Sequence, residues 1–117
     1  MVTNVKAQNY INFSFYDVEN VMRTRGYAVL VDKTDAGVVY LVASTSEQVR
    51  IYYFNRNNIC IRYVYTVLDA TYALLDQALR TNNYVRHGDG KYYYKDYVAD
   101  IVYSDIFKCW VASVDLK

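Results

Sequence analysis

The pattern of polar and apolar positions predicts two helices, each followed by a run of strands. Residues 1–12 start polar and then turn mixed, which predicts a frayed arm or a short edge strand. Apolar residues then recur at helical spacing and predict a helix over residues 15–25. Ser14 can cap the amide of Asp17 at its start, and Gly26 supplies the left-handed backbone that ends many helices.

A second helical repeat lies near the middle of the chain, where apolar residues stand at i, i+4, i+7 and i+11: Leu68, Tyr72, Leu75 and Leu79. Thr66, with Asp69 three residues further on, has the spacing of a capping box. We therefore expect a second helix over residues 67–80.

The other segments are rich in β-branched and aromatic residues, which is typical of strands. Four predicted strands separate the helices, over residues 27–31, 38–43, 49–54 and 59–67. Strands are also expected over residues 84–86, 91–97, 98–103 and 106–114, although residues 97–103 fit a short helix as well. Short connectors favour antiparallel neighbours. The prediction is an α+β fold, with a mainly antiparallel, tyrosine-rich sheet of about six to eight strands and two helices packed on it.

Composition narrows the class of protein. A chain of 117 residues fits one domain, residues 1–117, and 54% hydrophobic residues suffice to fold it without metals or disulfides. A formal charge of +1 gives no strong attraction to a polyanion or to an anionic membrane. No secretory signal pattern and no apolar run of ~18 residues is visible. We expect a cytoplasmic protein with free thiols and no membrane contact.

The hairpin of residues 49–54 and 59–65 carries the largest aromatic surface, if Phe54 stands opposite Ile59. One face then holds Arg50, Tyr52, Phe54, Ile59, Ile61, Tyr63 and Tyr65, and the other holds Val49, Ile51, Tyr53, Cys60, Arg62 and Val64. Neither face is polar. Two alternatives follow: a hairpin buried on one face with tyrosines at its margin, or an exposed aromatic platform.

Tyrosine and arginine are the usual anchors of protein interfaces. The candidate protein-binding residues are Arg50, Tyr52, Tyr63, Tyr65, Tyr92, Tyr93 and Tyr94. The sequence thus favours a non-enzymatic, accessory or inhibitor-type domain that binds a protein partner or a second copy of itself. By analogy, such small binders are common among phage and viral products. A single-stranded nucleic-acid binder with stacked tyrosines is the alternative, which ranks lower because no cationic groove is evident.

No catalytic residue, metal site or cofactor is predicted. His87 stands before Gly88, Asp89 and Gly90, a run typical of a hairpin turn. Cys60 and Cys109 lie among apolar residues, which would raise a thiol pKa. The four glycines form no phosphate-binding loop, and no spacing of His, Cys or carboxylates suggests a metal.

Overall fold

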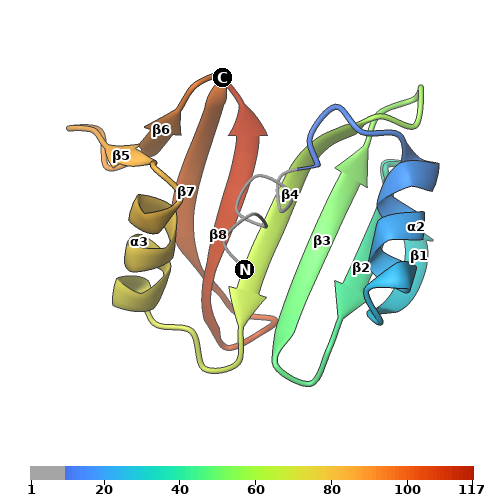
Figure 1. Cartoon of the computed structure of the whole chain (residues 1–117), viewed down its shortest axis with the longest axis horizontal. Helices are drawn as coiled ribbons and strands as arrows, with labels where there is room; N and C mark the ends of the chain where they lie inside the picture. The colour runs from blue at the N-terminus through green and yellow to red at the C-terminus, as the bar shows by residue number, and fades with distance from the viewer. Residues whose placement is uncertain (1–9) are drawn as a thin grey trace.

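The structure is a computed structural model that describes residues 10–117, and these residues form one eight-stranded antiparallel sheet with two helices (Figure 1). This confirms the predicted α+β fold. The sheet order is β1-β2-β3-β4-β8-β7-β6-β5. The elements of the first half are α2 (Phe15–Thr24), β1 (Ala28–Lys33), β2 (Val39–Ser44), β3 (Gln48–Phe54) and β4 (Cys60–Val67). Those of the second half are α3 (Tyr72–Thr81), β5 (Val85–Arg86), β6 (Tyr92–Tyr94), β7 (Tyr97–Ser104) and β8 (Cys109–Leu116).

The order of elements repeats. Each half is a helix followed by a four-stranded meander, and the halves join where β4 pairs with β8, from Arg62 opposite Asp115 to Tyr65 opposite Ala112. No sequence repeat signals this arrangement. The two shortest strands, β5 and β6, lie toward one edge of the sheet, and β1 forms the other edge.

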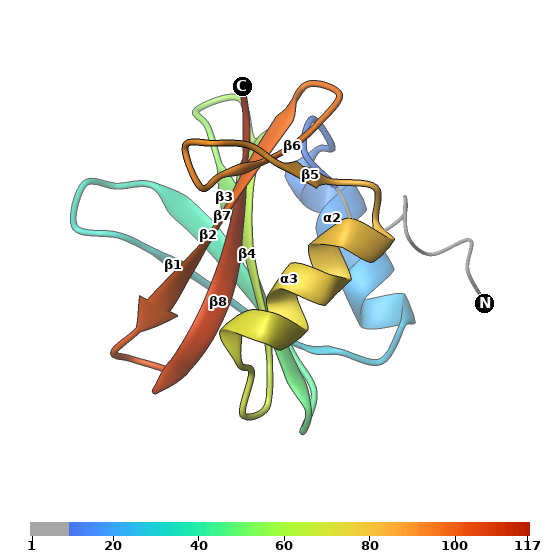
Figure 2. The same cartoon turned by 90° about the vertical axis from the view of Figure 1, so that its left-hand side faces the viewer.

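Both helices lie on the same side of the sheet (Figure 2). Val18 and Met22 of α2, and Leu75 and Leu79 of α3, are buried against it. Of the predicted N-terminal arm, residues 1–9 lie outside the described residues. At the end of this predicted arm, Tyr10 and Ile11 belong to the core, because both are buried in the same apolar cluster. None of the helices in the described part of the chain is long and apolar enough to cross a membrane.

The first helix begins as predicted, since the amide of Asp17 donates to Ser14 Oγ at 3.2 Å. It ends at Thr24, and Gly26 has a φ of 85°. The second helix begins five residues later than predicted. Its cap is Thr71, whose Oγ accepts from the amide of Leu74 at 3.1 Å.

The prediction that Thr66 caps the second helix was wrong because β4 continues through it. Val67 pairs with Gln48 of β3, and the Thr66 hydroxyl donates to the Trp110 carbonyl at 2.7 Å. Leu68, assigned to the apolar face of the helix, lies in the following turn and is 70% exposed. The spacing of Thr66 and Asp69 does match a capping box, but the pairing of β4 with its neighbouring strands determines the structure of this segment.

The strands of the second half begin and end at other residues than predicted. A turn at Lys95 and Asp96 divides the segment 91–97, and Lys95 adopts a φ of 52° there. Residues 97–103 are strand, not helix, because β7 pairs with β8 over its full length. β8 starts at Cys109, three residues later than expected, because residues 105–108 form the turn between β7 and β8.

The register of the central hairpin is shifted from the expected one. Phe54 stands opposite Cys60 instead of Ile59, with an irregularity between Tyr53 and Phe54. This shift turns Cys60 into the core, where it is fully buried, and leaves Ile61 exposed. Tyr52 stands opposite Tyr63, where the expected register has Ile61, but Arg50, Tyr52, Tyr63 and Tyr65 lie on one face as predicted.

The position of α3 can be tested with neighbouring leucines. Leu75 is fully buried and Leu74 is 45% exposed. Leu75→Ala should lower the free energy of unfolding by ~2–5 kcal/mol, because it removes core contacts and leaves a cavity. Leu74→Ala should change it by less than ~0.5 kcal/mol. Urea denaturation measures both, and equal losses would contradict this helix orientation.

Candidate functional site: an arginine chamber and an open sheet face

Four of the predicted binding residues gather on the helix-covered side of the sheet: Arg50, Tyr52, Tyr63 and Tyr65. Arg50 is 4% exposed and Tyr52 has no exposed surface, while Tyr65 is half-buried. The structure therefore brings these residues together, but in the interior. Of the two alternatives for the hairpin, this face is the buried one.

Arg50 is held by an aromatic and an amide side chain. Its guanidinium carbon lies 4.9 Å from the centre of the Tyr65 ring, and its Nε donates to Gln48 Oε1 at 3.2 Å. Burial disfavours the charged form, but neighbouring phenol oxygens, that of Tyr52 foremost, more than offset this and keep the pKa of Arg50 above its ordinary value. The charge is therefore retained inside the fold.

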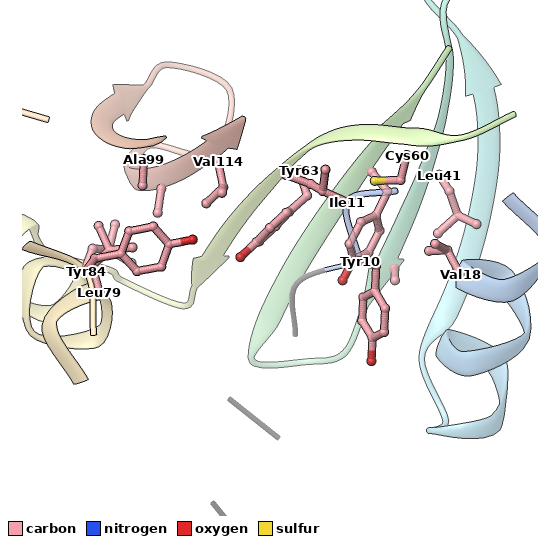
Figure 3. Packing of buried hydrophobic residues seen from close by; sticks show 14 of the residues in the cluster. Tyr10, Ile11, Val18, Leu41, Cys60, Tyr63, Leu79, Tyr84, Ala99 and Val114 are labelled. Atoms are coloured by element: carbon pink, nitrogen blue, oxygen red, sulfur yellow. The ribbon is translucent and has the colours of Figure 1, made fainter. Parts of the chain in front are cut away.

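A cavity of about 60 Å³ adjoins this arginine, between α3 and the sheet. Tyr63 and Tyr84 line it, and the hydroxyl ends of the two rings point toward one another (Figure 3). Asn82, which caps the end of α3, and aliphatic residues of α3 and β8 complete the wall. We call Arg50, Tyr63, Tyr65, Asn82 and Tyr84 the arginine chamber.

Tyr92, Tyr93 and Tyr94 each have different surroundings, and Tyr94 packs beside the arginine chamber. Tyr92 is buried; its hydroxyl donates to Asp76 of α3 and lies 3.4 Å from the Tyr72 hydroxyl. Asp76 also pairs with Arg80 at 3.1 Å, so this network fastens α3 to β6. Tyr94 is half-buried with its ring 5.5 Å from that of Tyr84.

Tyr93 belongs to the opposite side of the sheet and to the hairpin turn. Its hydroxyl donates to Asp89 Oδ2 at 2.7 Å, and its ring centre lies 4.3 Å from that of His87. The His87 amide donates to the Lys91 carbonyl at 2.8 Å, which closes the predicted turn. His87 thus has a structural place at an exposed tip.

The side of the sheet opposite the helices carries a second aromatic and charged group, which we call the open face. The Arg62 guanidinium lies 5.7 Å from the centre of the Tyr53 ring, and Arg62 Nε lies 3.5 Å from Asp115 Oδ1. Tyr40 packs beside Tyr53 with ring centres 5.9 Å apart. Tyr53 and Arg62 belong to the second face predicted for the hairpin, but they are not among the predicted binding residues. The signal that could have identified this face is the alternation of Tyr53 with Tyr52 along the strand.

The two cysteines have different surroundings. Cys60 is buried, and burial raises the pKa of its thiol to about 12, so the thiolate is scarce at neutral pH. Cys109 Sγ lies 3.4 Å from the Thr66 hydroxyl. Within residues 10–117, no three His, Cys, Asp or Glu side chains are grouped so that they could hold a metal ion.

No family model matches the chain, and no curated protein and no solved structure is significantly similar to it. The functional argument therefore depends on the residues of this chain.

The phenols should titrate in two groups. Burial raises the pKa of Tyr52 and of Tyr84 to about 12, and it also raises that of Tyr63. The folded protein keeps these phenols neutral where an unfolded chain ionises them at ~10, so stability is complete below pH ~10 and falls as the pH rises toward 12. Absorbance at 295 nm during alkaline titration should show a late step coincident with unfolding.

A matched pair of variants assigns that late step. Tyr52→Phe should reduce its amplitude by one phenol, whereas Tyr16→Phe, at a residue that is 73% exposed, should leave it unchanged. Ionisation of all fifteen tyrosines in one step near pH 10, with the fold intact, would contradict the burial described here.

Proposed function

We propose that this protein is a non-enzymatic protein-binding domain that docks through the open face of its sheet. The observation that carries the proposal is the one-sided placement of the helices: α2 and α3 both cover the other side (Figure 2). An uncovered sheet face with aromatic and aliphatic side chains is the usual sign of an interaction surface.

The chemistry of the open face suits a protein partner. Its central row runs across the strands through Leu30, Val42, Ile51 and Val64, which stand opposite one another in the register. Tyr40, Tyr53 and Arg62 lie in the next row. An apolar centre with tyrosine and arginine beside it is the composition of a binding hot spot.

Charge indicates which kind of partner fits. Asp32 and Asp115 stand at the two ends of the row that holds Tyr40, Tyr53 and Arg62, and Asp100 stands in line with the central row beyond Val64. Because Arg62 is already paired with Asp115, the remaining carboxylates favour a partner whose apolar patch has Lys or Arg beside it. They also weigh against the alternative of a single-stranded nucleic-acid binder, because phosphates would be repelled.

An accessory or inhibitor-type role in the cytoplasm, of the kind found among small phage and viral proteins, is part of this proposal. The support is the size of the chain and the chemistry of the open face. The competing possibility is that a second copy of the chain binds to the same face. A mass in solution that corresponds to two chains for the wild type and to one chain for Tyr53→Ala would favour self-association over a separate partner.

The test compares proteins retained by the immobilised wild type with those retained by two variants. Tyr53→Ala should abolish binding of the true partner, while Tyr16→Ala, a tyrosine equally easy to remove but located on α2, should retain it. Loss of one central interface tyrosine costs ~2 kcal/mol or more, a factor of roughly 30 in Kd. Calorimetry with the purified partner measures this factor.

Two results would overturn the proposal. One is a partner that binds wild type and Tyr53→Ala equally, which would move the interface elsewhere. The other is retention of labelled single-stranded DNA or RNA that weakens steeply with salt and depends on Tyr53, which would establish the nucleic-acid alternative.

A further inference from the structure

Arg50 presents an electrostatic problem that the described chain does not solve. A buried charge is normally paired with an opposite charge, because the loss of hydration costs several kcal/mol. Arg50 is 4% exposed, yet its polar contacts are one amide oxygen and the faces and hydroxyls of tyrosines. An arginine cannot relieve the cost by losing its proton.

Among residues 10–117, no carboxylate forms an ion pair with Arg50. The ion pairs of the described residues lie elsewhere: Arg23 with Glu19, Arg62 with Asp115, and Arg80 with Asp76. Residues 1–9 contain no Asp or Glu, as the sequence shows. The buried Tyr52 hydroxyl lies near Arg50 but makes no hydrogen bond of regular geometry, and as a neutral group it does not balance the charge of Arg50.

The cavity beside Arg50 has a size and lining that match a small anion. Its volume of about 60 Å³ is several times the ~10–15 Å³ that a cavity needs to hold one water molecule, so it can take a group of a few heavy atoms. Among the described residues that line it, Arg50 alone carries a formal charge, and the others are apolar or neutral. Asn82, Tyr63 and Tyr84 add neutral polar groups around the same space.

We propose that the arginine chamber binds a carboxylate group, with the Arg50 guanidinium as its counter-ion and the Asn82 amide and tyrosine hydroxyls as further donors. The site lies on the opposite side of the sheet from the open face, so it stands independently of the proposed protein-binding role. The carboxylate belongs to a small free acid or to the end of a chain, and both present the same three atoms to the chamber.

Carboxylate fits better than other anions for three reasons. Its two oxygens match the planar fork of N–H donors on a guanidinium. Its single charge balances the single charge of Arg50, whereas a phosphate dianion would leave one negative charge buried. Its three atoms occupy less of this small volume than the five atoms of a phosphate group do.

The probe is sodium formate, the smallest carboxylate, titrated into protein labelled with ¹⁵N at arginine. The Nε–Hε signal of Arg50 should shift and saturate with formate, while sodium chloride and sodium phosphate at matched ionic strength should not reproduce the shift. N-Acetylglycine, a mimic of a chain terminus, distinguishes the two sources: stronger binding than formate indicates a chain end, and exclusion indicates a small free acid.

Two arginine variants at the site and one outside it complete the test. Arg50→Met should fold, since an apolar side chain of similar volume commonly replaces a buried charged one without loss of stability. This variant should not bind formate, which the line width of ¹³C-formate measures. Arg50→Lys keeps the charge without the fork and should bind at least tenfold more weakly. Arg80→Met, at a surface pair, should bind as the wild type does. An absent or unsaturable shift, an equal response to chloride, or retained binding in Arg50→Met would each overturn the proposal.

Discussion

The structure depends on a mismatch between a wide sheet and two short helices. Eight strands about 4.8 Å apart make a sheet roughly 34 Å across, whereas each ten-residue helix is about 10 Å in diameter with its side chains. Both helices lie on one side, α2 near β1 and β2 and α3 near β7 and β8 (Figure 1). The strip between them, over β3 and β4, is filled by side chains of the sheet and by the buried segment that precedes α2, with Tyr10 packed against Tyr52. Neither of the two described helices lies on the opposite side.

The gap between the helices accounts for several of the buried tyrosines. Tyr10, Tyr52, Tyr63 and Tyr84 reach across a space that Leu or Val would leave empty, and each carries a hydroxyl into the interior. Such hydroxyls create a polar environment in which Arg50 is buried. The arginine chamber is thus a consequence of spanning a wide sheet with narrow helices, and its cavity is what the rings fail to fill.

Much of the fold followed from local pattern, and the failures share a cause. Ser14 and Gly26 act within a few residues, so the first helix was predicted to within one residue of its end. Thr66 matched a cap equally well, but its hydroxyl bonds to Trp110, a partner 44 residues away that no local pattern reveals. The shift that places Cys60 in the core is likewise set by pairing between strands. For the site, the alternation of side chains along a strand correctly predicted that Tyr52 and Tyr53 lie on opposite faces of the sheet. Which of the two faces the helices cover depends on tertiary packing, and this packing buries Arg50 and leaves Arg62 exposed.

The most direct test of one-sided coverage compares adjacent tyrosines by hydroxyl-radical footprinting of the monomeric protein with mass spectrometry. Tyr53 should be oxidised faster than Tyr52, and Tyr93 faster than Tyr92, because each pair straddles the sheet and the helices shield one side. Equal rates within both pairs, or faster oxidation of Tyr52 and Tyr92, would contradict the account.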